Sequence, residues 1–267
     1  MSENHLRFRV GAVSYLNTVP LVWGMLRGPQ ANFVELSFSV PSVCAEQVQR
    51  GEVEIGLAPV AEIARQGLEI VPGVGITCYG AVRSILLFSR VPWGKIRSLA
   101  ADAGSRTSVL LASVILQERF GVQPNIAAQP PNLHEMLDDA DAALVIGDAA
   151  LRLEPERLPF ACLDLGEEWR KLTGLPMVFA AWAGKPGIPL EPLQDLTVGS
   201  YQFGRDRLGE IAEGESGSRH ISQELATQYL THHIRFEIGP KEQEGLEVFL
   251  DLANLRQTTL AQNASHR

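Results

Sequence analysis

Two short stretches of the sequence combine polar side chains with the expected start of a helix. The first is VSYLNTVP, residues 13–20, which follows an apolar run and contains Ser14, Tyr15 and Asn17 but no charged residue. The second is DAGSRTS, residues 102–108, which leads into the helical pattern VLLASVILQERFG. The first N–H groups of a helix lack partners within it, and the helix dipole places positive charge there. Both stretches therefore predict a site for an anion or another hydrogen-bond acceptor.

The second stretch supplies its polar groups from four consecutive residues, 105–108. Arg106 adds a guanidinium that can pair with a carboxylate, and Thr107 and Ser108 add backbone N–H groups beside their hydroxyls. The alternative is that Ser105 only caps the helix while Arg106 points into solvent. The residues of this stretch alone support both interpretations equally.

A third candidate is VIGDAA, residues 145–150, at the end of an expected buried strand. Gly147 allows the backbone to come close to a ligand, and open α/β sheets bind ligands at the carboxyl ends of their strands. Asp148 next to it is a candidate ligand contact, although capping of the following helix is the simpler role for its side chain. Tyr15 and Trp182 are candidates to line a cleft, but aromatic residues near strand ends belong more often to the core.

Several common kinds of active site are not indicated. The sequence contains no G-x-S-x-G, H-E-x-x-H, P-loop or G-x-G-x-x-G motif, which disfavours serine hydrolases, zinc proteases, NTPases and dinucleotide enzymes. His232 and His233 are adjacent and would point to different faces of a helix, so they do not form a metal site. The three cysteines are too widely spaced to suggest a zinc knuckle or a disulfide framework.

Composition indicates a folded protein that does not bind nucleic acid or anionic membranes. The chain has 267 residues, of which 45% are hydrophobic, and its formal net charge is -8. Binding to phosphate groups needs clustered Lys and Arg, so an anionic ligand must be held by a local positive site. No apolar run reaches the ~18 residues of a membrane span, and no basic region followed by an apolar segment opens the chain. We therefore expect a cytoplasmic protein.

The alternation of short apolar runs with helical patterns predicts an α/β protein with parallel sheets covered by helices. Helices are expected to open at Thr18, Ser42, Ser105, Asn132 and Gly166, and helical periodicity dominates after residue 187. The expected strands are residues 8–13, 34–40, 54–58, 84–89, 98–101, 126–128, 142–146 and 177–182.

This order of elements predicts two lobes with a cleft between them. We expect lobe 1 to comprise residues 1–88 and 184–267, with the helical tail returning to it, and lobe 2 to comprise residues 89–183. The runs SILLFS (84–89) and MVFAAWA (177–183) are the expected crossings, with hinges near Phe88 and Ala181. The polar helix starts would then face each other across the cleft, an arrangement suited to a small anion that also carries hydroxyl or ether oxygens.

Five motifs in order resemble one known family. They are SYLNTVP (14–20), VRSILLFS (82–89), SRTSV (105–109), DAALVIGDAAL (141–151) and DLGEEWRKLTGLP (164–176). Together they resemble the chorismate dehydratases of the futalosine route to menaquinone, over residues 7–255. One departure is CYGA, residues 78–81, where relatives often have a Ser and a Pro around the Gly.

The resemblance implies the two-lobed, type II periplasmic-binding-protein-like fold, used inside the cell as an enzyme. It implies removal of water from chorismate to give 3-[(1-carboxyvinyl)oxy]benzoate, without a cofactor or a metal, with the enolpyruvyl carboxylate of the substrate taking the proton. By resemblance Asn17 and Ser84 are the catalytic residues, hydrogen-bonding the leaving hydroxyl or a carboxylate. The expected substrate-binding residues are Ser14, Tyr15, Ser105, Arg106, Thr107, Ser108, Gly147 and Asp148.

Three other functions compete with this interpretation. A 1,4-dihydroxy-6-naphthoate synthase of the same pathway shares the fold but relies on a histidine base, and His134 lies in an expected surface helix. A non-enzymatic binding protein for a small carboxylate would normally carry an export signal. An effector domain of a transcription regulator would need a helix-turn-helix or a basic stretch, and neither is present. The sequence makes no prediction about oligomeric state.

Overall fold

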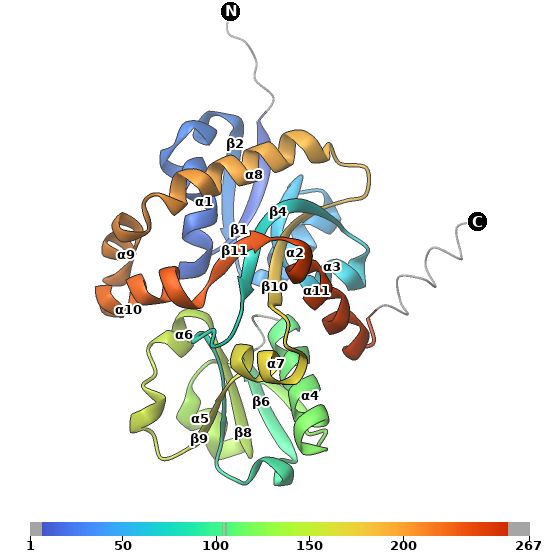
Figure 1. Ribbon diagram of the computed structural model, residues 1–267, viewed down its shortest axis with the longest axis vertical. Helices are drawn as coiled ribbons and strands as arrows, with labels where there is room; N and C mark the ends of the chain where they lie inside the picture. Colours follow the sequence, from blue (N-terminus) through green and yellow to red (C-terminus); the bar gives the residue numbers. More distant parts are fainter. Residues whose placement is uncertain (1–6, 103, 105, 256–267) are drawn as a thin grey trace, which may run out of the picture.

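The computed structural model describes residues 7–102, 104 and 106–255 of the chain. Within them the protein forms two lobes, each built around one β-sheet with helices on its faces (Figure 1). The sheet of the first lobe has the strand order β11-β4-β10-β3-β1-β2, and the sheet of the second lobe has the order β7-β6-β8-β5-β9. The strands are β1 (Phe8–Val13), β2 (Val34–Ser39), β3 (Ile55–Pro59), β4 (Glu69–Cys78), β5 (Ile85–Ser89), β6 (Ser98–Asp102), β7 (Asn125–Gln129), β8 (Ala142–Ile146), β9 (Ala161–Asp164), β10 (Met177–Gly184) and β11 (Arg235–Ile238).

Helices connect most of these strands and form the carboxyl-terminal part of the chain. Proline at the first position and a left-handed glycine after the last residue delimit α2, where Pro41 opens the helix and Gly51 closes it with φ of 74°. A 3₁₀ turn, Leu16–Thr18, precedes α1, and a π-helical turn, Tyr229–His233, follows α10. The helices are α1 (Val19–Arg27), α2 (Pro41–Arg50), α3 (Val60–Gln66), α4 (Arg106–Phe120), α5 (Leu133–Asp139), α6 (Gly147–Leu151), α7 (Leu165–Thr173), α8 (Leu190–Arg205), α9 (Leu208–Ser216), α10 (Gln223–Gln228) and α11 (Pro240–Leu252).

All eight strands expected from apolar runs are present, with bounds within two residues of the expected ones. Three further strands, β4, β9 and β11, were not expected. In β4 the sequence EIVPGVGITC has turn-forming residues in its middle, and the strand accommodates them through Gly73 at φ of 110° and irregular pairing with β10. β9 and β11 are only four residues long and carry no clear alternation.

The expectation of parallel sheets is wrong, because both sheets are mixed. In the first lobe β1 pairs in parallel with β2 and β3, whereas β10 runs antiparallel to β3 and β4. In the second lobe β6 pairs in parallel with β7 and β8, whereas β5 runs antiparallel to β8 and β9. The antiparallel strands β5 and β10 are those by which the chain enters the second lobe and returns to the first. Neighbouring strands that run in parallel need a crossover connection, usually a helix. In the element order described, no such connection joins β5 or β10 to a neighbour in its sheet.

The chain changes sheets slightly earlier than the apolar runs suggested. SILLFS forms β5 inside the second sheet, and MVFAAWA forms β10 inside the first sheet, so neither run is itself a crossing. The passages between sheets are residues 79–84 and residues 165–176, the latter including α7. The division of the chain at residues 88 and 183, and the hinges near Phe88 and Ala181, stay predictions.

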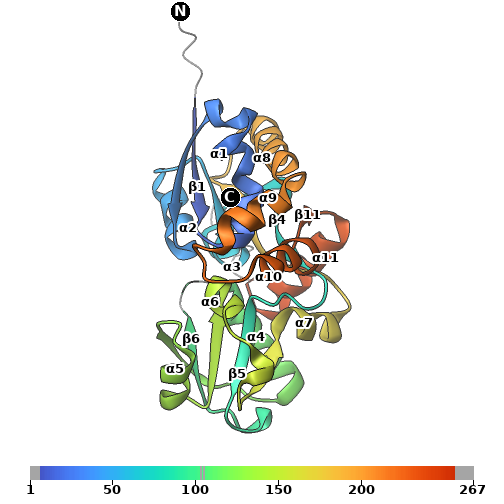
Figure 2. The ribbon, with the colours of Figure 1, turned by 90° about the vertical axis from the view of Figure 1, so that its left-hand side faces the viewer.

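Part of the helical tail packs on the sheet and helices of the first lobe. Helix α8 lies along α1 and beside β4, and two glycines allow the close approach to α1. A Cβ atom on Gly204 would lie 2.1 Å from the carbonyl oxygen of Pro20, and one on Gly24 would lie 2.5 Å from the Cα of Ser200. The tail also reaches the second lobe, because α10 lies next to α6 where the lobes meet (Figures 1 and 2).

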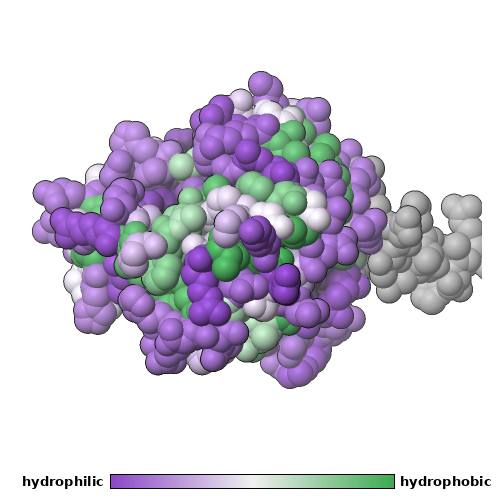
Figure 3. Space-filling model, turned by 90° about the horizontal axis from the view of Figure 1, so that it is seen from below, coloured by the Kyte–Doolittle hydropathy of each residue, from purple (hydrophilic) through white to green (hydrophobic). Residues whose placement is uncertain are grey.

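The surface at the free end of the second lobe is mostly hydrophilic, with apolar side chains in small patches between polar ones (Figure 3). Across the described part of the chain, every helix is too short or too polar to cross a bilayer.

Helices α3 and α4 join the two lobes through polar contacts. The Thr107 hydroxyl of α4 accepts a hydrogen bond of 3.2 Å from Ala61 N in the first turn of α3. Arg106 Nε lies 2.9 Å from Oε1 of Glu62, whose side chain is only 3% exposed. Burial raises the pKa of Glu62, but hydrogen bonds from Arg65 and Gln66 and the charges of both arginines outweigh it. The pKa of Glu62 is therefore below its ordinary value.

We expect Glu62→Gln to lower the free energy of unfolding by about 1–3 kcal/mol at pH 7, because its charged contacts with Arg106 of the other lobe and Arg65 of its own helix are lost. A carboxyl with a lowered pKa stabilises the fold above the unfolded-state value of 4.5, and this contribution disappears as pH falls through the folded-state value. The difference from wild type should thus shrink between pH 5 and pH 3, measured by urea unfolding. Glu118→Gln, an exposed position on α4, is the control. A difference that is constant with pH would contradict this account.

Candidate functional site

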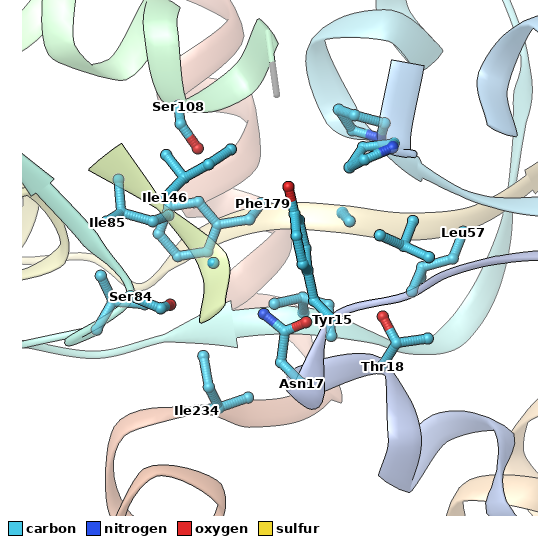
Figure 4. A pocket seen from close by; sticks show the side chains of 17 residues that line it. Tyr15, Asn17, Thr18, Leu57, Ser84, Ile85, Ser108, Ile146, Phe179 and Ile234 are labelled. Carbon is cyan, nitrogen blue, oxygen red and sulfur yellow. The ribbon is translucent and has the colours of Figure 1, made fainter. Parts of the chain in front are cut away.

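A cavity lies between the lobes and takes its lining from both (Figure 4). Most of the lining is apolar, and the polar side chains are those of Tyr15, Asn17, Thr18, Ser84 and Ser108. The remaining lining residues are Val13, Pro41, Leu57, Pro59, Ile76, Val82, Ile85, Ile146, Gly147, Phe179, Ala180 and Ile234. A small molecule with an apolar body and a few oxygen atoms suits such a lining.

The cavity lies where helices of both lobes begin. Asn17 and Thr18 belong to the 3₁₀ turn before α1, Pro41 opens α2, and Ser108 is in the first turn of α4. Backbone N–H groups and the positive ends of helix dipoles favour bound anions. Among the described lining residues there is no Lys, Arg or His, so the arrangement can hold carboxylates through N–H and hydroxyl groups.

Asn17 and Ser84, which come from different lobes, are linked through a buried tyrosine. Asn17 Nδ2 donates a hydrogen bond of 3.1 Å to the hydroxyl of Tyr229, and that hydroxyl donates one of 2.8 Å to Ser84 Oγ. Tyr229 is 1% exposed, and burial raises the pKa of its hydroxyl above the ordinary value. Sequence reasoning missed Tyr229, because it lies 212 residues from Asn17 in a stretch with ordinary helical periodicity.

Ser84 is held by the passage that leads into the second lobe. The preceding residue, Arg83, has φ of 64°, a conformation that is costly for a residue with a side chain. Asp164 secures it by accepting hydrogen bonds from Val82 N (2.9 Å) and Arg83 N (2.6 Å), while the Arg83 guanidinium donates to Ala150 O at 3.0 Å. Burial raises the pKa of Asp164, although backbone N–H donors oppose this. The Ser84 side chain is therefore held in place by a backbone with few alternative conformations.

Asp148 joins the second lobe to the turn that carries Asn17. Its Oδ1 accepts a hydrogen bond of 3.0 Å from Leu16 N, and its Oδ2 pairs with Arg219 from the helical tail. Arg219 also donates to Ser14 O at 2.9 Å and pairs with Glu215 at 2.9 Å. Asp148 thus satisfies an N–H group at the start of a helical turn in the other lobe, not in its own helix.

The predicted site residues divide into three groups. Tyr15, Asn17, Ser84, Ser108 and Gly147 line the cavity together. The other described ones do not line it: Ser14 is exposed, Arg106 pairs with Glu62, Thr107 is buried against α3, and Asp148 pairs with Arg219. Ser105 lies outside the described residues. Trp182 is fully buried in β10 and belongs to the core, which was the simpler of its two interpretations. The roles of these residues toward a substrate stay predictions.

Two lobes with a cavity between them define the class of periplasmic-binding-protein folds, and comparison with solved structures agrees. A protein of Archaeoglobus fulgidus matches with a TM-score of 0.77 at 14% identity, covering 96% of this chain and 99% of that one. The alkanesulfonate-binding protein of Xanthomonas axonopodis pv. citri, bound to MOPS, matches with a TM-score of 0.68 at 13% identity, covering 97% and 94%. A Candida albicans gene product with the generic periplasmic binding protein fold matches with a TM-score of 0.56 at 13% identity, covering 95% of each chain.

Sequence comparison identifies the family. Residues 8–255 match the family model for menaquinone biosynthesis, and the chain belongs to this family. The chorismate dehydratase of Thermus thermophilus is 28% identical over 222 residues, which are 76% of this chain and 81% of that protein. The chorismate dehydratase of Campylobacter jejuni is 28% identical over 178 residues, which are 65% of this chain and 66% of that protein.

Gly147 offers a test of how closely the lobes must fit at the cavity. It has φ of 61°, and a Cβ atom there would lie 2.9 Å from the ring of Tyr15. We expect Gly147→Ala to cost about 1–2 kcal/mol from the left-handed conformation alone. The clash with Tyr15 adds to this cost and moves the ring within the cavity.

The matched control is Gly121→Ala, because Gly121 has φ of 69° and a Cβ atom there would meet nothing within 4 Å. Thermal unfolding of both variants, with binding of a candidate ligand by calorimetry, separates the two effects. Gly121→Ala should lose stability only, whereas Gly147→Ala should lose more stability and also weaken binding. Equal losses of stability and binding in the two variants would show that the contact with Tyr15 affects neither quantity.

Proposed function

We propose that the protein is a chorismate dehydratase, a hydro-lyase that removes water from chorismate to give 3-[(1-carboxyvinyl)oxy]benzoate in menaquinone biosynthesis by the futalosine pathway. Membership of the menaquinone biosynthesis family over residues 8–255 and the two chorismate dehydratase relatives support this. The structural observation that carries the proposal is the meeting of Asn17 and Ser84, from different lobes, at one cavity. The cytoplasm is the compartment we propose for this biosynthetic step.

The chemistry of chorismate explains what the cavity must do. The proton to be lost is on the ring carbon that bears the enolpyruvyl ether, and the hydroxyl to be lost is on the neighbouring carbon. Negative charge that develops on the first carbon spreads through the ring double bond into the ring carboxylate. Hydrogen-bond donors at that carboxylate therefore stabilise the transition state. Backbone N–H groups in the first turn of α4, beside Ser108, are suited to this role.

The base in this proposal is the enolpyruvyl carboxylate of the substrate itself. Among the described residues that line the cavity there is no Asp, Glu, His or Lys to take the proton. The task of the protein is then to hold the side chain of the substrate over the ring proton. Correct positioning of reacting groups can lower a barrier by several kcal/mol. We assign this positioning to Asn17 and Ser84, which hydrogen-bond the leaving hydroxyl or a carboxylate.

The histidine-dependent 1,4-dihydroxy-6-naphthoate synthase reaction receives no support from the cavity, whose described lining contains no histidine. The second candidate is a binding protein without catalytic activity, because the Xanthomonas axonopodis protein with a similar fold is an alkanesulfonate-binding protein. Fold alone does not separate the two functions. An assay with chorismate does.

The assay mixes purified, metal-stripped protein with chorismate and follows the products by liquid chromatography with mass detection. We expect a product lighter than chorismate by one water, with benzoate absorbance, formed well above the uncatalysed rate. Thermal stabilisation by chorismate without product would instead establish the binding protein.

We expect Asn17→Ala and Ser84→Ala each to lower kcat by about 100-fold or more, the scale of a lost group that positions or polarises the substrate. Their unfolding midpoints should remain close to that of wild type. Asn125→Ala and Ser218→Ala, at exposed positions away from the cavity, are the matched controls and should retain full activity. Unchanged turnover in both cavity variants would contradict the roles assigned to these two residues.

A further inference from the structure

Tyr229 is hydrogen-bonded to both Asn17 and Ser84. It comes from the π-helical turn of the carboxyl-terminal tail, whereas Asn17 comes from the 3₁₀ turn of the first lobe and Ser84 from the passage into the second. Single π-helical turns within helices are often found at functional sites. The hydroxyl of Tyr229 is thus the point at which three separate segments meet.

The direction of these hydrogen bonds determines which donors and acceptors Asn17 and Ser84 still have for a bound molecule. The hydroxyl of Tyr229 accepts from Asn17 Nδ2, and its other hydrogen-bond neighbour is Ser84 Oγ at 2.8 Å. A buried hydroxyl hydrogen needs an acceptor, so the hydrogen of Tyr229 points to Ser84 Oγ. Since Ser84 Oγ accepts from the tyrosine, the hydroxyl hydrogen of Ser84 remains for another acceptor. Asn17 keeps its amide oxygen and one N–H. In Figure 4 the amide nitrogen of Asn17 is on the side of Ser84, and its oxygen is on the opposite side.

We infer that Tyr229 is a positioning residue that sets the hydrogen-bond polarity of the Asn17–Ser84 pair, so that Ser84 presents a donor and Asn17 presents an acceptor to the molecule in the cavity. This inference rests on the proposed function. A donor at Ser84 stabilises the negative charge that develops on a leaving hydroxyl. The amide oxygen of Asn17 accepts from a substrate hydroxyl and orients it. Without the tyrosine hydroxyl both side chains can rotate, and Ser84 can turn its lone pairs toward the substrate.

Burial keeps this polarity constant. Tyr229 is 1% exposed, and burial raises the pKa of its hydroxyl above the ordinary value for tyrosine, while the bonds to Ser84 and Asn17 oppose the shift. The hydroxyl therefore remains a neutral donor at neutral pH. In a buried network each group depends on the orientation of its neighbours.

The test compares Tyr229→Phe with Tyr201→Phe. Tyr201 is also buried in the tail, at 6% exposed, and its ring packs against Phe236 with the centroids 5.3 Å apart, away from the cavity. We expect Tyr229→Phe to lower kcat by about 10–100-fold with a smaller change in KM, the scale of a misplaced catalytic group. Tyr201→Phe should leave both constants within about twofold of wild type. Equal kinetics for Tyr229→Phe and wild type would overturn the inference.

A double-mutant cycle distinguishes positioning through Ser84 from a general structural role. If Tyr229 acts through Ser84 as well as Asn17, the Tyr229→Phe/Ser84→Ala double variant should lose clearly less activity than the product of the two single losses. Losses that multiply, accompanied by a lower unfolding midpoint in Tyr229→Phe, would indicate that the tyrosine only supports the fold. Single-turnover measurements at high enzyme concentration give the needed sensitivity for the slow variants.

The proposed function is tested separately, because that test uses only the wild-type protein with chorismate. If wild type binds chorismate without converting it, the polarity is tested by calorimetry instead. A Kd for chorismate at least tenfold higher in Tyr229→Phe than in wild type would then support positioning, and equal values would overturn it. If wild type neither converts nor binds chorismate, the proposed function fails, and this inference fails with it.

Discussion

The contact of Asp148 with Leu16 N and Arg219 connects the two lobes at the cavity. One carboxylate from α6 satisfies an N–H group at the turn that carries Asn17 and neutralises an arginine from the tail. The side chains of Asp148 and Arg219 are 15% and 14% exposed, so their charges are only partly solvated and depend on each other. Removing one partner of such a pair leaves an uncompensated charge. The placement of Asn17 in the first lobe therefore depends on a group from the second lobe.

A protein with a net charge of -8 must hold a dianionic substrate through local features. Long-range electrostatics oppose the approach of an anion to this chain, whereas the starts of helices attract one over a few ångströms. The described lining of the cavity has no basic side chain, and the nearby arginines 106 and 219 pair with carboxylates. Backbone N–H groups lose no side-chain entropy on binding, so they can hold a rigid substrate in one orientation. Such an orientation is what a substrate that supplies its own base requires.

The same fold serves binding proteins, and the difference lies in a few polar groups. A binding protein needs to satisfy the oxygen atoms of its ligand in the ground state. A dehydratase must also favour the charge that develops on a leaving hydroxyl. The hydrogen-bonded chain from Asn17 through Tyr229 to Ser84 is the group of residues to which we assign this second task. The left-handed Arg83 beside Ser84 indicates that the surrounding structure maintains a costly backbone at this point.

The sequence by itself determined the local elements, the α/β class, the two lobes and most of the polar groups at the cavity. Apolar runs such as residues 8–13 and 142–146 predict strands, and hydroxyls before an apolar helical pattern predict helix starts, because these signals depend on neighbours along the chain. Asn17 was recognisable beside an expected helix start, whereas Ser84 was singled out only by the resemblance to the family. Only the tertiary structure decided that β10 returns antiparallel, that Asp148 serves the turn of the other lobe, and that Tyr229 joins Asn17 to Ser84. The hydrogen bonds of Asp148 and Tyr229 join residues 132 to 212 positions apart. Their partners are selected by packing of the whole chain, which no local spacing records.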